Sequence, residues 1–137
     1  QRKAIRVAQE IPADLPLVTW DADRIVQVLT NLLVNAAQAV DAGGRITVRA
    51  RCEEGWLSLE VEDNGPGIAA RDRTKIFDPF FTTKPEGTGL GLSISYGIVD
   101  EHGGRIEVEG RPRDDVGPGE ATGTTMRVVL PVGELPV

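Results

Sequence analysis

The stretch Asp63-Asn64-Gly65-Pro66-Gly67-Ile68 decides how the rest of the chain is interpreted. It follows an alternation of apolar residues at Leu57, Leu59 and Val61, which predicts a half-buried strand. Side chains on a strand alternate between two faces, so Asp63 falls on the buried side at the strand's end. A buried carboxylate needs a partner, and the glycines that follow let the backbone turn sharply or approach a ligand closely. The segment is either the floor of a small-molecule site or simply a strand that ends in a turn.

Upstream, Asp21 is a suitable N-cap for a helix that runs to about Val40. The apolar stripe expected at helical spacing is Ile25, Leu29, Leu32, Leu33, Ala36 and Val40. The other side carries Arg24, Gln27, Asn31, Asn35 and Gln38. Asparagine is a mediocre helix former, so two of them one turn apart need an explanation. Asn31 and Asn35 either belong to a solvated polar face or present a pair of amide oxygens to a ligand or a hard cation.

Downstream, the glycine-rich stretch Gly87-Thr88-Gly89-Leu90-Gly91-Leu92-Ser93 leads into an apolar helix that ends at about Glu101. Glycines at the start of a helix free backbone N–H groups and the positive end of the helix dipole for phosphate. By itself this is weak evidence, because glycine-rich turns often only turn the chain. The spacing does not fit the dinucleotide fingerprint, and the sequence contains no Walker A pattern.

The remaining segments predict strands. A short first strand is expected at Ile5 to Val7, followed by alternating strands at 46–52, 57–63, 106–108 and 124–130. Thr124 is in phase with the core positions of the last strand, and Cys52 is expected to be a small core residue. The order of helices and strands predicts an α+β fold: a two-layer sandwich with one mixed, mostly antiparallel sheet and helices on a single face.

Composition limits the classes of protein that fit. The chain has 137 residues, enough for a single domain (1–137, with a core of about 5–132), and 40% of them are hydrophobic. The net charge of −6 argues against bulk electrostatic binding of nucleic acid. A lone cysteine fits a reducing compartment, and no apolar run is long enough to span a membrane. We therefore expect a cytoplasmic chain. It could be a piece of a longer protein or the soluble part of a membrane-bound sensor.

Four segments together resemble the sequence boxes of sensor histidine kinases. Asn31-Leu32-Leu33-Val34-Asn35-Ala36 is similar to the N box of that family, and Asp63 to Ile68 to its G1 box. Ile76 to Phe81 resembles the F box, and Gly87 to Leu92 the G2 box. The resemblance runs from about Arg6 to Pro131 and implies the catalytic, ATP-binding domain, with the Bergerat fold shared with gyrase, Hsp90 and MutL. The short lid segment Thr82-Thr83-Lys84 is most like the nitrogen-regulation subtype.

The resemblance also implies roles. Asn35 would ligate Mg²⁺ on the ATP triphosphate, Asn31 would line the same phosphate site, and Asp63 would accept a hydrogen bond from adenine. Phe77 to Lys84 would form a mobile lid, with Lys84 a candidate contact to the γ-phosphate. The implied catalytic residues are Asn31, Asn35 and Lys84. The implied cofactor contacts are Asn31, Asn35, Gln38, Asp63, Gly65, Gly67, Ile68, Phe77, Thr83, Lys84, Gly87, Thr88, Gly89, Leu90, Gly91, Leu92 and Thr124.

The implied reaction is transfer of the γ-phosphoryl group of ATP to a histidine on a separate dimerisation domain of the same protein, with a response regulator as the next partner. Many family members carry a lysine where this chain has Gln38, which increases the importance of Lys84. His102, the only histidine, is expected to belong to a structural turn.

Three alternatives stay open. An ATPase clamp of the same superfamily would place a glutamate base where this chain has Asn31, and an anti-sigma-type serine kinase fits the F box and the lid less well. The third is a nucleotide-binding module that has lost catalysis.

Overall fold

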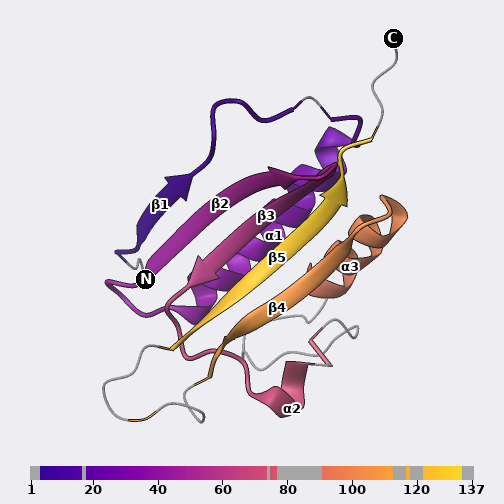
Figure 1. Ribbon diagram of the computed structural model, residues 1–137. Coiled ribbons are helices and arrows are strands. Elements are labelled where there is room, and N and C mark those ends of the chain that lie inside the picture. Colours follow the sequence, from indigo (N-terminus) through magenta and orange to yellow (C-terminus); the bar gives the residue numbers. More distant parts are fainter. Residues whose placement is uncertain are drawn as a thin grey trace.

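The computed structural model describes residues 4–16, 18–73, 75–76, 91–112, 117 and 122–133. Its five strands are β1 (Arg6–Glu10), β2 (Arg45–Glu53), β3 (Trp56–Asp63), β4 (Arg105–Arg111) and β5 (Gly123–Pro131). They form one sheet in the order β1-β2-β3-β5-β4, in which β1 is parallel to β2 and the other neighbours are antiparallel (Figure 1). The helices are α1 (Ala22–Ala39), α2 (Ala70–Arg73) and α3 (Gly91–Glu101). The predicted α+β fold with a mixed, mostly antiparallel sheet is confirmed.

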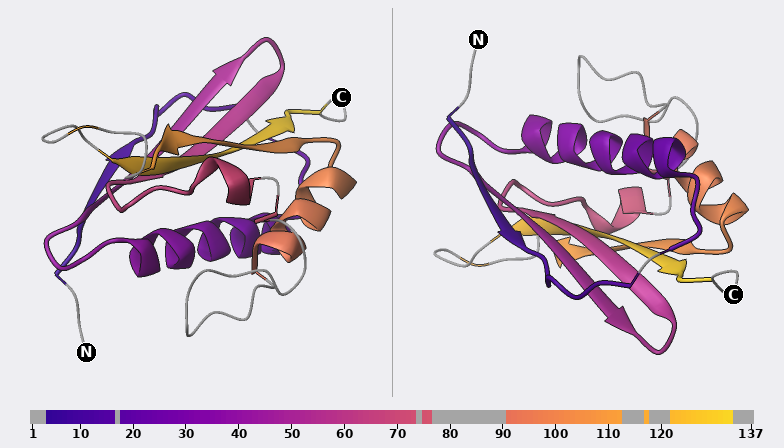
Figure 2. Two further views of the ribbon diagram at one scale, coloured as in Figure 1. Left: turned by 90° about the horizontal axis from the view of Figure 1, so that it is seen from below. Right: turned by 90° about the horizontal axis from the view of Figure 1, so that it is seen from above.

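Helices α1 and α3 lie side by side against one face of the sheet (Figure 2). Asp21 caps α1 as predicted, since its side chain accepts a hydrogen bond from the backbone N–H of Arg24 at 3.3 Å. The predicted stripe needs one correction: Val28 is buried, whereas Leu29 is only half-buried. Val28 lies toward the side of α1 that carries Asn31, which contacts α3. The neighbouring helix therefore extends the buried arc of α1 on that side.

The hydrophobic core lies between these helices and the sheet. Its buried members are Ile25, Val28, Leu32, Ala36, Ile46, Val61, Ile76, Ile98, Val99, Met126, Val128 and Leu130. Helix α3 ends at Glu101, and Gly103 follows with φ +77°, a left-handed conformation that favours glycine after a helix. None of the helices in the described ranges has the length and apolar character needed to cross a membrane.

Cys52 is exposed, so its prediction as a core residue was wrong. The alternation of β2 is correct at Ile46 and Ala50, which are buried. However, β1 pairs with β2 only from Arg45 to Arg49. Beyond that point β2 is an edge strand, and its last residues extend past their neighbour. Strand alternation alone cannot show where a neighbouring strand ends.

The helix-free face of the sheet carries a network of charged side chains. Arg127 on β5 contacts Glu60 at 2.6 Å, Glu109 at 2.6 Å and Glu107 at 3.2 Å. The hydrogen bonds that Arg127 donates to Glu109 and Glu60 raise the pKa of Arg127. The pKa of Glu109 is lowered by Arg127, and that of Glu107 by Arg105 and then Arg127. Strands β3, β4 and β5 are therefore tied together by ion pairs as well as by backbone hydrogen bonds.

Candidate functional site

Asp63 is buried at the end of β3, as its place in the strand alternation predicted, and is only 6% exposed. The sheet register places it directly opposite Thr124 on β5, which is also 6% exposed. Both residues lie on the helix-covered face, in phase with Val61 and Met126 of the core. Two inward polar groups therefore meet at one edge of the core, although their positions are far apart in the sequence.

The turn after Asp63 is held from both sides. The Asp63 carboxylate accepts a hydrogen bond from the backbone N–H of Gly65 at 2.9 Å. The Asn64 side-chain oxygen accepts one from the backbone N–H of Arg45 at 2.8 Å. The Thr122 hydroxyl donates to the carbonyl of Gly65 at 2.7 Å. The turn is thus attached to β2 on one side and to the start of β5 on the other, which fixes the direction of the Asp63 side chain.

Glycine is required in this turn for two different reasons. A Cβ on Gly65 would lie 2.7 Å from the carbonyl oxygen of Ala39, so only glycine lets the turn approach the end of α1 this closely. Gly67 has φ +78°, where side chains other than hydrogen are strained. The turn is therefore shaped so that Gly65, two residues after Asp63, lies against the last turn of α1.

One side of α1 runs from this turn to the start of α3. Asn31, Asn35 and Ala39 are spaced by four residues and so lie above one another on the helix. Ala39 borders Gly65, as described above. Asn31 donates from its amide nitrogen to the carbonyl of Gly91, the first residue of α3, at 3.2 Å. Asn35 is half-buried between these two ends. The helix therefore joins the two glycine segments that the sequence singled out.

The other predicted site residues fall into three groups. Ile68 and Leu92 are half-buried and pack against the core, whereas Gln38 is exposed near the end of α1. Phe77, Thr83, Lys84, Gly87, Thr88, Gly89 and Leu90 lie outside the residues that the structure describes. The lid and the first part of the glycine-rich segment therefore stay predictions.

His102 has a structural position, as expected. Its Nδ1 lies 2.8 Å from the carbonyl oxygen of Ile98, and its Nε2 lies 3.3 Å from the backbone nitrogen of Asp21. A carbonyl can only accept and a backbone N–H can only donate, so the proton sits on Nδ1 and Nε2 is the acceptor. The ring thus joins the end of α3 to the N-cap of α1, with both nitrogens engaged by backbone.

Sequence reasoning missed Thr122 and Ser95. Thr122 precedes Thr124 by two residues, so strand alternation carried over from β5 would have placed it on the same face. Ser95 is 0% exposed and lies at helical spacing from Ile98 and Val99, which are both buried. A polar residue in phase with a core stripe was the available sign, and it identifies Ser95 as a further inward polar group beside the site.

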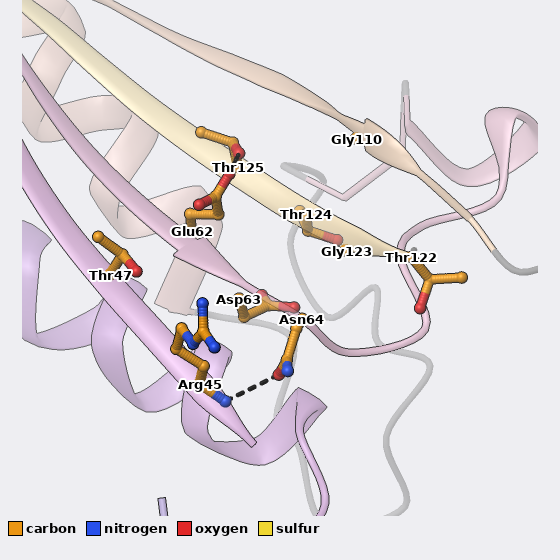
Figure 3. A pocket seen from close by; sticks show the side chains of 10 residues that line it. All are labelled: Arg45, Thr47, Glu62, Asp63, Asn64, Gly110, Thr122, Gly123, Thr124 and Thr125. Atoms are coloured by element: carbon orange, nitrogen blue, oxygen red, sulfur yellow. Dashed lines mark hydrogen bonds between the residues drawn. The ribbon is translucent and has the colours of Figure 1, made fainter. Parts of the chain in front are cut away.

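A pocket of about 460 Å³ opens next to the turn that follows Asp63 (Figure 3). It is lined by Arg45, Thr47, Glu62, Asp63, Asn64, Gly110, Thr122, Gly123, Thr124 and Thr125. In Figure 3 the side chains of Glu62 and Thr125 stand in front of the strands, and α1 lies behind them. This pocket is therefore on the helix-free face, whereas Asn31, Asn35 and the Asp63 carboxylate belong to the helix side.

The donor set on the helix side fits only one kind of metal site. Across the described ranges, no group of three or more histidine, cysteine, aspartate or glutamate side chains could hold a metal ion. The amides of Asn31 and Asn35 are oxygen donors without charge. Mg²⁺ is commonly held by few protein ligands, with waters and substrate phosphates completing its shell. The residues present therefore fit a magnesium ion that arrives with a phosphate ligand.

Known proteins are similar to this chain in sequence and in fold. Residues 20–134 match the family described as "Histidine kinase-, DNA gyrase B-, and HSP90-like ATPase". The sensor histidine kinase ZraS of Escherichia coli K12 is 44% identical over 118 residues, which cover 86% of this chain and 24% of ZraS. The sensory histidine kinase/phosphatase NtrB of Rhizobium leguminosarum bv. phaseoli is 36% identical, with 95% of this chain and 36% of NtrB covered. The chain thus spans about a quarter to a third of these relatives.

Solved structures of histidine kinases are also similar to this chain in fold. The catalytic domain of the histidine kinase ThkA has a TM-score of 0.79 and 38% identity, with 93% of this chain and 79% of that domain covered. A complex of ThkA with the response regulator TrrA matches with a TM-score of 0.75 and 34% identity, over 94% of this chain and 34% of that chain. Full-length ShkA in complex with AMPPNP matches with a TM-score of 0.81 and 28% identity, over 97% of this chain and 27% of that chain.

Proposed function

The chain belongs to the histidine kinase-, DNA gyrase B- and HSP90-like ATPase family, as a domain of the histidine kinase catalytic type, and on this premise we propose that it binds Mg-ATP and transfers the γ-phosphoryl group to a histidine. The acceptor histidine would lie on a separate dimerisation domain of the same full-length protein. The phosphoryl group would then pass to the receiver domain of a response regulator in two-component signalling. No nucleic acid is involved, and the reaction takes place in the cytoplasm, including the cytoplasmic part of a membrane-bound sensor.

The observation that carries this proposal is the side of α1 that joins the two glycine segments. Asn31 and Ala39 are eight residues apart, or about 12 Å at a rise of 1.5 Å per residue. At one end lies the turn with the buried Asp63, and at the other lies the start of α3. A nucleoside triphosphate laid along this side would have its base at Asp63 and its phosphates beside Asn31 and the helix start, where free N–H groups favour anions.

Each residue then has a role that suits its chemistry. The Asp63 carboxylate would accept a hydrogen bond from the adenine amino group, with Thr124 and Gly67 beside the base. Asn35 would hold Mg²⁺ through its amide oxygen, and Asn31 would line the same phosphate site one turn earlier. Magnesium, when bound, would neutralise charge on the β- and γ-phosphates. Lys84 and the segment from Gly87 to Gly91 are proposed to hold the phosphates from the other side.

The same residues argue against the ATPase clamp. Hydrolysis needs a group that takes a proton from water, and in the clamp pattern that group is a carboxylate at position 31. Here Asn31 is an amide whose nitrogen donates to Gly91 and Ser95, and an amide does not accept a proton at neutral pH. Phosphoryl transfer to another domain needs only positioning and charge stabilisation of the γ-phosphoryl group, which the proposed residues supply.

The test is a labelling experiment with γ-radiolabelled ATP. We expect the isolated chain to bind Mg-ATP, to hydrolyse it slowly and to leave itself unlabelled. Adding the histidine-bearing dimerisation domain in trans should label that domain, weakly because the effective concentration of a tethered domain is lost. Self-labelling that disappears in His102→Ala would make His102 the acceptor and overturn the proposal. Rapid hydrolysis without a partner would favour the ATPase clamp instead.

A further inference from the structure

We propose that Ser95 is a positioning residue that holds the Asn31 amide in place, in the polarity that the Gly91 carbonyl sets, so that the side-chain oxygen of Asn31 is available to the metal. This inference rests on the proposed function, because it concerns the same phosphate site. It assigns a role to a residue that lies outside the four sequence boxes. Ser95 would not touch the nucleotide but would act through Asn31.

The Asn31 amide is held by two acceptors on α3. Its nitrogen lies 3.2 Å from the carbonyl oxygen of Gly91 and 3.1 Å from the hydroxyl oxygen of Ser95. An asparagine amide has two N–H donors and one acceptor oxygen. Because a backbone carbonyl can only accept, the nitrogen and not the oxygen must face Gly91. Both N–H donors thus have acceptors on α3, and the side-chain oxygen lies beside the start of that helix, 4.0 Å from where a Cβ on Gly91 would be.

Burial explains why a hydroxyl at position 95 matters. Ser95 is 0% exposed and shares its helix face with Ile98 and Val99, where an apolar side chain would pack without a polar cost. A buried hydroxyl without a partner is unfavourable. Within the described part of the chain, no buried side-chain nitrogen or oxygen lacks a partner. The hydroxyl of Ser95 meets this requirement through Asn31.

The polarity of the amide decides whether it can serve a cation. A terminal amide rotates between two broad orientations, and one of them would turn the NH₂ group toward Mg²⁺, which binds only oxygen here. That flip would set the Asn31 oxygen against the carbonyl oxygen of Gly91, which can only accept, so Gly91 disfavours it. Ser95 adds a second hydrogen bond that limits rotation of the amide. Removing the hydroxyl should therefore loosen the Asn31 amide and weaken the metal-dependent part of nucleotide binding.

Ser95→Ala tests this in the intact chain. Calorimetry would give the dissociation constant for ATP with Mg²⁺ and with EDTA. We expect Ser95→Ala to weaken binding with Mg²⁺ by about threefold to tenfold, as for one hydrogen bond, and to leave binding in EDTA unchanged. Ser95→Thr, which keeps the hydroxyl, should restore the Mg²⁺ effect. Ser58→Ala removes the same atom from a half-exposed site on β3 and should change neither constant.

A double-mutant cycle separates positioning from simple packing. In the Asn31→Ala background, Ser95→Ala should have no further effect on the Mg²⁺-dependent constant. Additive losses, or equal losses with and without Mg²⁺, would overturn the inference while leaving the proposed function intact. Failure of the unmodified chain to bind Mg-ATP would instead overturn the proposed function.

A second measurement does not depend on the variants being stable. Nitrogen-15 NMR of the unmodified chain without nucleotide would follow the side-chain amide of Asn31, identified by its loss in Asn31→Asp. Its protons should exchange with solvent more slowly than those of the exposed Gln38 on the same helix. Exchange as fast as that of Gln38 would show that the amide is not held, and would overturn the inference.

Discussion

At the scale of single residues, Asp63 combines a structural and a proposed binding role. Its carboxylate already holds the N–H of Gly65, and this bond shapes the turn. A carboxylate has about four lone-pair sites, so the bond to Gly65 does not by itself use up its capacity to accept. Asn35 differs, because its proposed task depends on the amide oxygen as a metal ligand. Substitutions at the two positions should therefore have different effects.

Asp63 should determine the choice of base. Adenine offers an amino donor at the edge where guanine offers a carbonyl oxygen, and an unpaired buried polar group costs about 1–3 kcal/mol. We expect ATP to bind at least about tenfold tighter than GTP. Asp63→Asn keeps an oxygen for Gly65 but adds a donor toward the base, so the preference for ATP should shrink. Equal dissociation constants in the unmodified chain would show that Asp63 does not read the base; Asp41→Asn, at an exposed site, is the control.

Asn35→Ala should abolish phosphoryl transfer to the histidine-bearing domain and weaken Mg²⁺-dependent binding of nucleotide. The fold should survive, because alanine is the best helix former and Asn35 is only half-buried. Circular dichroism would establish the fold, and labelling of the acceptor domain would measure transfer. Unchanged transfer would show that Asn35 is not the metal ligand. Gln27→Ala, at an exposed position two turns earlier on the same helix, provides the matched control for binding.

At the scale of elements, the pair α1 and α3 is joined at two places. Asn31 contacts the first turn of α3, and His102 joins the end of α3 to the N-cap of α1. Because the helices are antiparallel (Figure 2), these two contacts lie at different points along α1. The contact at Asn31 belongs to the proposed site, whereas the one at His102 only supports the packing of the helices.

His102→Ala should therefore lower stability without removing the proposed activity. Loss of two backbone partners of a half-buried ring should cost about 1–3 kcal/mol of unfolding free energy. Urea denaturation followed by circular dichroism would measure this. Transfer from Mg-ATP to the acceptor domain, assayed well below the unfolding midpoint, should continue. A loss of transfer in a folded variant would contradict a purely structural role.

The sheet offers a comparison between two ion pairs on neighbouring strands. Glu60, with an 8% exposed side chain, meets Arg127 at 2.6 Å. Glu53, with a 70% exposed side chain, meets Arg51 at 3.7 Å. Breaking a buried pair leaves an uncompensated charge, whereas exposed pairs contribute little. We expect Glu60→Gln to lower the unfolding free energy by about 1–3 kcal/mol and Glu53→Gln to change it by less than about 0.5 kcal/mol. Equal losses of unfolding free energy in the two variants, measured by urea denaturation, would show that the buried Glu60–Arg127 pair contributes no more than the exposed pair.

At the scale of the whole molecule, the two faces of the sheet are stabilised differently. One face packs apolar side chains against α1 and α3, and this burial does not depend on pH. The other face relies on carboxylates that must stay ionised to meet Arg127 and Arg105.

Acid should therefore destabilise the protein below about pH 4.5, the ordinary pKa of these groups. Arg127 and Arg105 lower the pKa values of Glu109 and Glu107 in the folded state, so the unfolded chain takes up protons first as the pH falls. Their contribution is complete above about pH 4.5 and is lost as the pH falls through the lowered values. Urea denaturation between pH 7 and pH 3 should show a decline that is less steep in Glu109→Gln. A decline equally steep in that variant and in Glu53→Gln would contradict the assignment to this network.

Several features followed from the sequence alone because they depend on neighbouring residues. Alternation with a period of two placed Asp63 and Thr124 inward, and the cap at Asp21 began α1 where predicted. The spacing of Asn31 and Asn35 put both on one side of the helix. These are local properties of strands and helices, so a short stretch of chain determines them, and together they indicated the α+β class. The family was indicated separately, by the resemblance of four segments to the boxes of sensor histidine kinases.

Other features were decided only by the tertiary structure, because their partners are far apart in the chain. The register of β3 with β5 sets Asp63 opposite Thr124. The packing of α3 beside α1 buries Val28 and gives Ser95 its partner, Asn31, 64 positions away. The end of β1 leaves Cys52 exposed. Local patterns show which way a side chain points, but only the packed chain determines which group it meets, since that depends on where distant elements come together.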